Sequence, residues 1–324
     1  MYFWGKNDHG QLGLSVEGRV STPTIVPING RVIQVCCGNT HSMVLMGDGS
    51  LFTFGDNIEG QLGVGDTSKR YSPVKVSSLS GVDQIGCGYC HSLALVGNCL
   101  YAWGANGHGE CGFESLEKVL LPRKVDLGFA KDKKLIQICG GNGFSVALLS
   151  DGSIYCWGHN DSGQLGVDTL SHSSTPFKIV TQKPAVQISC GGSFAACLFE
   201  DGSLNLWGEY KESLDVSQRI IQLSSGHYHI LALVEDGSVY YWRRVDKAQE
   251  NPGEKMEKLG ECVEVLCGNC HSLAITKEGE LFGWGYNGFG QLGTDNFDYD
   301  VPSPLHIPFE HNGISFMPFN NQNK

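Results

Sequence analysis

The chain repeats one short motif, and this repetition limits its possible folds more than any other feature of the sequence. A glycine followed three residues later by His or Phe recurs six times, and a step from an aromatic residue to glycine recurs every 35 to 54 residues. The aromatic residues of these steps are Trp4, Phe54, Trp103, Trp157, Trp207 and Trp284, with Trp242-Arg243 as a degraded copy. A period near 50 residues indicates an array of units that pack on their neighbours.

Each unit predicts four short strands separated by glycine turns. Pairs such as Asp48-Gly49 are expected to close hairpins, because tight hairpin turns need positive φ. Strands that contain Pro, such as Ser72–Val76, are expected at the outer edge of each sheet, because Pro cannot donate a ladder hydrogen bond. The loop Asn-x-x-Gly-Gln-Leu-Gly recurs, for example over residues 57–63, and its Leu is expected to fill the gap between neighbouring sheets. Together these features predict an all-β, seven-bladed propeller.

The two ends of the chain do not complete a seventh unit. The sequence starts on an aromatic strand, and it ends where a seventh His-Ser strand is expected. We therefore predict a single domain over residues 1–317, followed by a polar C-terminal tail over 318–324. In this domain both termini share one irregular closing blade, where residues 2–4 join strands at 304–307 and 313–316. A truncated, poorly closed propeller whose free edge pairs with another chain is the alternative.

The histidines of the repeat are candidates for either catalysis or structure. Because Phe144 and Phe194 fill the same slot without disrupting the pattern, we expect hydrogen-bonded structural residues and not catalytic bases. The expected structural residues are His41, His91, His229, His271, Trp4, Trp103, Trp157, Trp207 and Trp284. No nucleophile with a separate base and acid stands out in the sequence, so we expect no enzyme.

The cysteines suggest cofactor chemistry that the repeat explains more simply. Cys87–His91 and Cys267–His271 both match Cys-x-x-Cys-His, a haem-attachment pattern, and also suggest zinc ligands. The first Cys and the His belong to the repeat, however, and adjacent strand residues point to opposite faces. We therefore expect no cofactor and no metal. Thirteen cysteines in a chain of this size favour reduced thiols in an intracellular protein of the cytoplasm or nucleus.

Charge and hydropathy exclude two classes of partner. The net charge is −11 and the sequence has no basic arm, whereas binding to a phosphate backbone needs clustered Lys and Arg. The sequence also has no run of 18 apolar residues, so we expect no membrane insertion and no nucleic-acid partner.

Two units depart from the repeat and mark a possible site. The loop after Trp207 has lost its Gly-Gln-Leu-Gly, and a polar stretch follows Trp242. Equivalent loops of successive blades lie on the same face, so we expect these two altered loops side by side. The candidate partner-binding residues are Glu209, Lys211, Arg243, Arg244 and Lys247.

The order Cys-Gly-x-x-His-Ser, Asp-Gly, Trp-Gly and Asn-x-x-Gly-Gln-Leu-Gly resembles the repeat of the regulator of chromosome condensation family. The resemblance covers residues 1 to 317 and is weak around Trp207 and Trp242. It implies a seven-bladed propeller and, for the founding member, nucleotide exchange on the small GTPase Ran.

Three departures shift the expected function away from the family's known roles. The family's chromatin binding uses a basic N-terminal tail, and the sequence shows no basic segment before the first strand. The family's exchange activity uses a β-hairpin wedge inserted into one blade, and no unit here is long enough to contain it. A plant ultraviolet photoreceptor of this family has tryptophans beside the histidines of its repeats. The corresponding positions here hold Thr40, Cys90, Gly143, Ser193, Tyr228 and Cys270, and none is Trp. We therefore expect a monomeric, non-enzymatic scaffold that docks a protein partner on one propeller face. A guanine nucleotide exchange factor for a Ran-like or other small GTPase is the alternative.

Overall fold

The computed structural model describes residues 1–128, 133–168, 170–209, 216, 218–243 and 253–308, and every regular element within them is a β-strand. In chain order the strands are β1 (Tyr2–Lys6), β2 (Arg19–Ile25), β3 (Val32–Cys37), β4 (His41–Met46), β5 (Leu51–Gly55), β6 (Arg70–Lys75), β7 (Gln84–Cys87), β8 (His91–Val96), β9 (Cys99–Gly104), β10 (Val119–Lys124), β11 (Leu135–Gly140), β12 (Phe144–Leu149), β13 (Ile154–His159), β14 (His172–Lys178), β15 (Ala185–Cys190), β16 (Phe194–Phe199), β17 (Leu204–Gly208), β18 (Ile220–Ser225), β19 (His229–Val234), β20 (Val239–Arg243), β21 (Glu254–Lys255), β22 (Cys262–Cys267), β23 (His271–Thr276), β24 (Leu281–Tyr286) and β25 (Asp300–Ile307).

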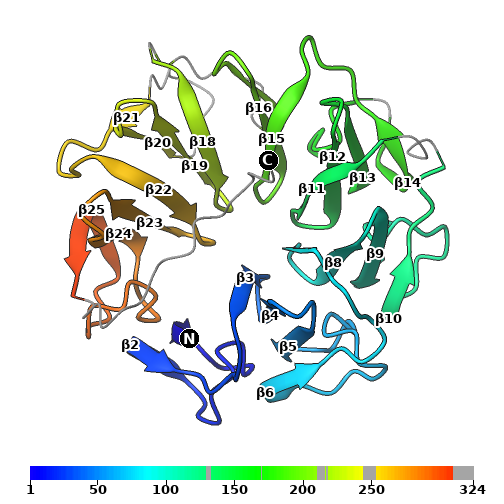
Figure 1. Ribbon diagram of the computed structural model, residues 1–324, viewed down its shortest axis with the longest axis horizontal. Coiled ribbons are helices and arrows are strands. Elements are labelled where there is room, and N and C mark those ends of the chain that lie inside the picture. The colour runs from blue at the N-terminus through cyan, green and yellow to red at the C-terminus, as the bar shows by residue number, and fades with distance from the viewer. Residues whose placement is uncertain (129–132, 169, 210–215, 217, 244–252, 309–324) are drawn as a thin grey trace.

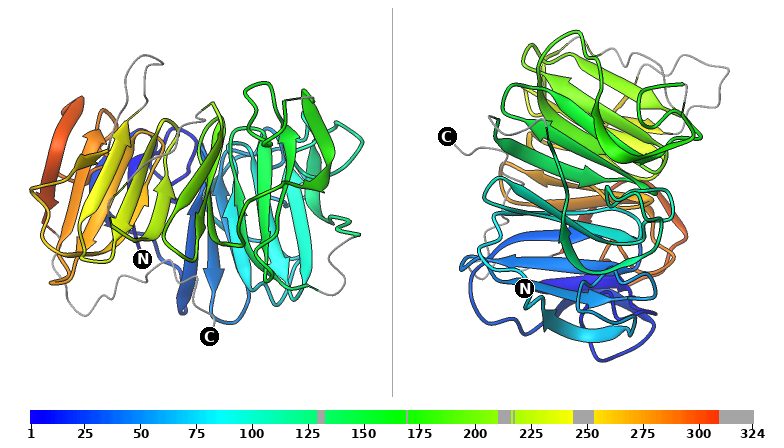
Figure 2. Two further views of the ribbon diagram at one scale, coloured as in Figure 1. Left: turned by 90° about the horizontal axis from the view of Figure 1, so that it is seen from above. Right: turned by 90° about the vertical axis from the view of Figure 1, so that its right-hand side faces the viewer.

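The strands form antiparallel sheets that stand in a ring around one axis (Figure 1). Six sheets are blades, here numbered in chain order: β3–β6, β7–β10, β11–β14, β15–β17, β18–β21 and β22–β25. The two-stranded sheet β1–β2 stands between blade 6 and blade 1, and the whole ring is a thick disc in side view (Figure 2). The predicted all-β propeller is confirmed.

Within a blade the strands follow one another from the axis to the rim, because each pairs with the next across a turn or loop. The hairpin glycines behave as predicted, since Gly49 and Gly152 have φ values of 77° and 76°. The strands that contain Pro are also where the sequence places them, because β6 and β10 are each the last strand of a sheet.

Neighbouring blades are joined near the axis by a repeated glutamine that the sequence analysis did not single out. The Gln34 side-chain amide donates to the carbonyl of Ile85 and its oxygen accepts from the N–H of Ile85, both at 2.9 Å. Gln137 makes the same two bonds with Ile188 of the next blade. The glutamines in this slot are Gln34, Gln84, Gln137, Gln187 and Gln222, and blade 6 carries Glu264 there.

In blades 1, 2, 3 and 6 the loop after the third strand is bound to the following sheet. Asn57 shapes the loop of blade 1, because its side-chain oxygen accepts from the N–H of Leu62 and its amide donates to the carbonyl of Asp66. Leu62 is fully buried. The carbonyl of Gln61 accepts two hydrogen bonds from blade 2, from Ser92 Oγ at 2.8 Å and from Trp103 Nε1 at 2.9 Å.

The predicted count of seven blades, the last one irregular and shared by both termini, is wrong, because the described residues form six blades of three or four strands and one two-stranded sheet. The error lies in the phase of the repeat. A strand that contains Pro ends the blade of the aromatic strand before it, because the connecting loop leads it back antiparallel onto that strand. Residues 304–307 therefore belong to β25, which pairs with β24 in blade 6 and not with residues 2–4.

The closing sheet completes the ring through side chains. In it β1 pairs with β2, and Trp4 Nε1 donates to the carbonyl of Gln291 in blade 6 at 2.9 Å. The Arg19 guanidinium lies 5.3 Å from the ring centre of Phe289, also in blade 6. The predicted contribution of residues 313–316 and the tail over 318–324 lie outside the described residues.

Candidate interaction face

The glycine of the repeat leaves space for the ring that follows it. A Cβ atom on Gly88 would lie 2.0 Å from Cε1 of His91, and one on Gly141 would lie equally close to Cε1 of Phe144. Neither glycine has a positive φ, so the requirement is for space and not for backbone freedom. This stacking explains why either His or Phe can fill the slot three residues after the glycine.

Each histidine contacts the serine of the next blade. His41 Nε2 lies 2.9 Å from Ser92 Oγ, and His91 Nε2 lies 2.9 Å from Ser145 Oγ. Because Ser92 donates its proton to the Gln61 carbonyl, it accepts from His41, whose proton is therefore on Nε2. His229 and Ser272 lie 3.0 Å apart in the same way between blades 5 and 6.

The two junctions that start from Phe lack the serine. Phe144 packs in one buried cluster with Ala195, and Phe194 packs in another with Ile230. Ala195 and Ile230 directly follow the aromatic slot of their blades, where the His-led junctions have Ser92 and Ser145. A polar ring thus meets a hydroxyl and an apolar ring meets an apolar side chain, so the His N–H groups of the polar junctions find an acceptor.

Burial keeps these histidines neutral. It lowers the pKa of His41 to about 4, that of His91 to about 3 and that of His229 to about 4, with a smaller effect of one histidine's charge on the next for His91 and His229. A neutral ring tied to a structural hydroxyl has no free proton donor for catalysis at neutral pH.

An aromatic cluster lies on the side of the disc that we call the loop face. This face carries the loops between first and second strands and between third and fourth strands, and the opposite one is the hairpin face. The ring centres of Tyr89 in blade 2 and His227 in blade 5 lie 6.1 Å apart, and those of His227 and Tyr228 lie 4.1 Å apart. Tyr228 is 41% exposed.

The structure describes two of the five candidate partner-binding residues. Glu209 lies on the loop face, and its charge acts on His227 of the aromatic cluster. Arg243 of blade 5 reaches blade 6, where it lies 3.9 Å from the Asp300 carboxylate. Lys211, Arg244 and Lys247 lie outside the described residues, so the predicted contact between the two altered loops stays a prediction.

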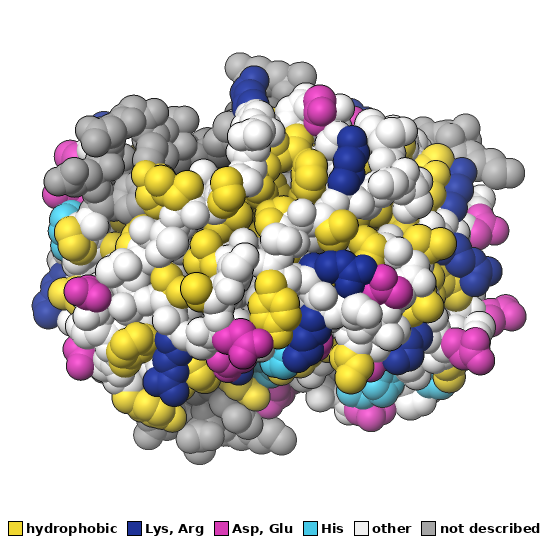
Figure 3. Space-filling view, turned by 90° about the horizontal axis from the view of Figure 1, so that it is seen from below, with side chains coloured by type: hydrophobic (Ala, Val, Ile, Leu, Met, Phe, Trp, Pro, Cys, Tyr) yellow, Lys and Arg dark blue, Asp and Glu magenta, His cyan; other side chains and the backbone are white. Residues whose placement is uncertain are grey.

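The described loops divide the charged side chains unequally between the faces. Those of the loop face hold thirteen carboxylates and two lysines, whereas those of the hairpin face hold twelve carboxylates and seven Lys or Arg. The loop-face residues are Asp8, Glu17, Asp56, Glu59, Asp66, Glu110, Glu114, Glu117, Asp161, Asp168, Glu209, Asp295 and Asp298, with Lys69 and Lys118. Figure 3 shows both signs of charge interspersed on the rim that carries β2 and β6.

Ion pairs neutralise part of the charge on both faces. On the hairpin face Lys133 pairs with Asp151 and Lys183 with Asp201, and on the loop face Lys118 pairs with Glu59 and Arg70 with Asp66. Two further acids of the loop face are buried. Glu110 replaces the repeat glutamine and accepts from the N–H of His108 at 2.8 Å, while burial raises the pKa of its carboxyl. Asp56 is 9% exposed. The loop face is therefore the more negative of the two.

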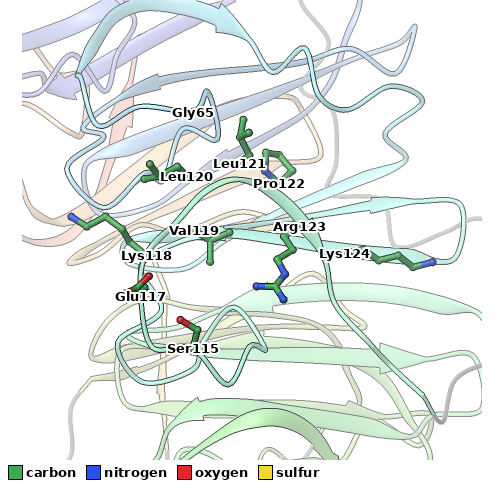
Figure 4. Close-up of a pocket in the computed structure, with 10 residues that line it drawn as sticks. All are labelled: Gly65, Ser115, Glu117, Lys118, Val119, Leu120, Leu121, Pro122, Arg123 and Lys124. Carbon is green, nitrogen blue, oxygen red and sulfur yellow. The ribbon is translucent and has the colours of Figure 1, made fainter.

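A groove of 720 Å³ runs along the edge strand β10 (Figure 4). Its cations are already engaged, since Lys118 Nζ donates to the Ile58 carbonyl at 2.8 Å and Arg123 lies 4.2 Å from the Phe113 ring centre. The lining contains no His or Cys and only one carboxylate, Glu117. Such a lining offers no acid–base pair for catalysis.

The described part of the chain contains neither a cluster of metal ligands nor a helix suited to span a membrane. No three His, Cys, Asp or Glu side chains within it converge in a way that could hold a metal ion. No helix there has the length and apolar character needed to cross a membrane.

Comparison with protein families decides the relationship. The model of the regulator of chromosome condensation (RCC1) repeat matches residues 1–45, 48–95, 98–148, 151–198 and 278–316, more than half of the chain. The chain belongs to this family. The RCC1-repeat matches skip residues 199–277, which include the altered units around Trp207 and Trp242, although a second model of the repeat matches 263–291.

Individual relatives are distant and longer. The chain is 26% identical over 321 residues to the Ultraviolet-B receptor UVR8 of Arabidopsis thaliana, which covers 95% of this chain and 54% of that protein. It is 30% identical over 306 residues to the X-linked retinitis pigmentosa GTPase regulator of Homo sapiens, covering 94% and 23%. The chain thus spans about half or less of these relatives' length.

The crystal structure of Prp20p from Saccharomyces cerevisiae superimposes with a TM-score of 0.84 at 22% identity. The superposition covers 95% of this chain and 85% of that one. At this identity the likeness establishes the propeller fold alone.

The matched junctions predict coupling between His91 and Ser145. Ser145→Ala leaves the buried His91 N–H unpaired, so we expect a loss of about 1–3 kcal/mol in the free energy of unfolding. His91→Phe should also destabilise. The double variant copies the Phe144–Ala195 junction. Its loss in the free energy of unfolding should be smaller than the sum of the two single losses, by about 0.5–3 kcal/mol. Urea unfolding of the four proteins measures this coupling, and simple additivity would contradict it.

The lowered histidine pKa values predict a pH dependence of stability. The unfolded chain binds protons near pH 6.5, whereas folded His41, His91 and His229 bind them only near pH 3–4. Their stabilising effect is complete above pH 6.5, and the free energy of unfolding should fall from there to pH 4 by roughly 3 kcal/mol per histidine.

The double variant His91→Phe/Ser145→Ala is the control for this pH dependence. Between pH 4.5 and 6 its slope should be smaller by about one proton, or about 1.4 kcal/mol per pH unit. Equal slopes in the variant and the wild type, measured by urea unfolding, would show that His91 does not titrate on unfolding.

Proposed function

We propose that this chain is a non-enzymatic protein-interaction module whose partner presents a basic surface to the loop face. The observation that carries this proposal is the charge imbalance of that face, with thirteen carboxylates against two lysines in its described loops. Negative potential over one face attracts a positive partner and repels phosphate backbones.

The centre of this face suits a protein partner. Tyr228 is exposed beside His227 and Tyr89, and tyrosine is enriched among the residues that dominate binding energy in protein interfaces. An exposed Tyr ring also binds Lys and Arg through cation–π attraction. Glu209 lies beside this cluster, and we include it in the docking surface proposed for the basic partner. Lys211, Arg243, Arg244 and Lys247 are proposed to contact acidic side chains of the same partner. The chain is proposed to act as a monomer.

Charge reversal on one face at a time tests this proposal. Glu114, Glu117 and Asp298 are exposed on the loop face, and Asp126, Glu257 and Glu278 are exposed on the hairpin face. Changing the loop-face triple to lysine should reduce capture of interacting proteins from cell extract at least tenfold. The hairpin-face triple, with the same change in net charge, should leave capture unchanged. Equal losses in both variants, or loss in the hairpin-face variant alone, would contradict docking on the loop face.

A second candidate function is nucleotide exchange on a small GTPase. Two similarities favour it: one relative is named as a GTPase regulator, and the Prp20p structure is described with its binding to Gsp1p. An exchange factor binds the nucleotide-free GTPase more tightly than the loaded form, so differential binding provides the acceleration.

Release of labelled GDP from a panel of small GTPases, Ran included, separates the two functions. We expect the wild-type chain to leave every release rate unchanged. An acceleration of about a hundredfold or more for one GTPase, abolished in the loop-face triple variant, would establish exchange activity. It would also replace the pure scaffold proposal.

A further inference from the structure

The junctions between blades bring two positions of neighbouring inner strands together. In blade 5 the residue two places after the repeat glutamine is Ser224, and in blade 6 the residue three places after Glu264 is Cys267. The N–H of Cys267 donates to Ser224 Oγ at 2.9 Å, and its Sγ lies 3.2 Å from the Ser224 carbonyl. We call these the second and third positions, counted from the residue in the glutamine slot. The second position of one blade therefore faces the third position of the next blade.

Cysteine fills both of these positions at two junctions. Between blades 1 and 2 they are Cys36 and Cys87, which pack in one buried cluster. Between blades 3 and 4 they are Cys139 and Cys190, which again pack in one cluster. The remaining described junctions carry Gly86 with Gly140 and Ser189 with Ser225.

We propose that Cys36–Cys87 and Cys139–Cys190 are two modification sites, at which a peroxide oxidises paired thiols to disulfides that join neighbouring blades. All four cysteines are free thiols in this structure. Each link would close a loop through the chain from one inner strand to the next. Of the thirteen cysteines, only these four meet the positional rule on both sides of a junction.

The reaction is a two-electron oxidation that balances with hydrogen peroxide. The thiolate of one cysteine attacks a peroxide oxygen, the O–O bond breaks, and hydroxide leaves and takes up a proton to form water. The resulting sulfenic sulfur is attacked by the partner thiolate, which breaks the S–O bond and releases a second water as the disulfide forms. The two thiols thus lose two protons and two electrons, and the peroxide becomes two waters.

The environment of the pairs sets the rate. Burial raises the pKa of the Cys87 and Cys190 thiols well above the ordinary value, and the hydrogen bond from the facing thiol adds to this effect. Because the thiolate is the nucleophile, both links should form slowly at neutral pH and several-fold faster at pH 9.

Mass mapping of the peroxide-treated native chain tests the pairing. After free thiols are blocked, a digest without reductant should contain two linked peptide pairs, 36–87 and 139–190, that dithiothreitol removes. Links dominated by other combinations, such as Cys37 with Cys87 or Cys139 with Cys156, would overturn the positional rule. Oxidation of the exposed Cys270 with neither predicted link formed would overturn the proposal itself.

A matched pair of variants tests the same geometry at another junction. Ser224→Cys places a thiol opposite Cys267 and should produce a third link. By the same rule Ser225→Cys, one residue farther along, belongs to the junction with blade 4 and should produce no link to Cys267. Linking of Cys267 in both variants would show that the second position of blade 5 is not the specific partner of the third position of blade 6, which would contradict the positional rule. Treatment in urea should give scrambled links, which shows that the native junction selects the partners.

Discussion

The propeller depends on a buried loop carbonyl at each of the three junctions that join blades 1 to 4. At the junction of blades 1 and 2 the Gln61 carbonyl accepts from Ser92 Oγ and Trp103 Nε1, and Ser92 in turn is bound by His41 of the preceding blade. The contact between blades buries these polar groups, and each would cost about 1–3 kcal/mol if it were buried without a partner. Neighbouring blades satisfy them for one another, which favours the closed ring over isolated sheets.

The junctions reach this result in two chemical ways. Blades 1, 2 and 5 use a histidine that binds the next blade's serine, whereas blades 3 and 4 use phenylalanine against Ala195 and Ile230. At the junction of blades 3 and 4 the Gln164 carbonyl still accepts from Trp207 Nε1 at 3.0 Å, although the preceding aromatic is Phe144. The buried indole N–H groups of Trp242 and Trp284 have no such partner among the described residues, so the carbonyl–indole bond is present at some junctions and not at others. The His–Ser bond occurs where both partners are polar.

The ring also explains why the two faces of the disc differ. Successive turns of an antiparallel blade alternate between the faces, so loops far apart in sequence collect on one side. The long loops that follow the third strands hold most of the loop-face carboxylates, while the connectors on the hairpin face supply Lys133 and Lys183 for ion pairs. This separation by sign is a property of the assembled propeller, and the proposed docking of a basic partner depends on it.

Much of the architecture follows from the sequence by itself, because strand length, turn glycines and the aromatic period are local properties. The positive φ of Gly49 and the rim position of β6 are examples. The phase of the blades was not predictable in this way, since residues 304–307 could pair with residues 2–4 or with β24 until the loop path was known. The repeated glutamine was visible in the sequence, but its partner is backbone and leaves no pattern of its own.

Only the tertiary structure decided which of the thirteen cysteines face each other and which loops share a face. Cys36 and Cys87 are 51 residues apart and neither differs chemically from the other cysteines. Their contact results from the register of two inner strands, which the bonds between Gln34 and Ile85 set. Local chemistry thus specified the repeat unit, and contacts between units specified everything that distinguishes one blade of this chain from the next.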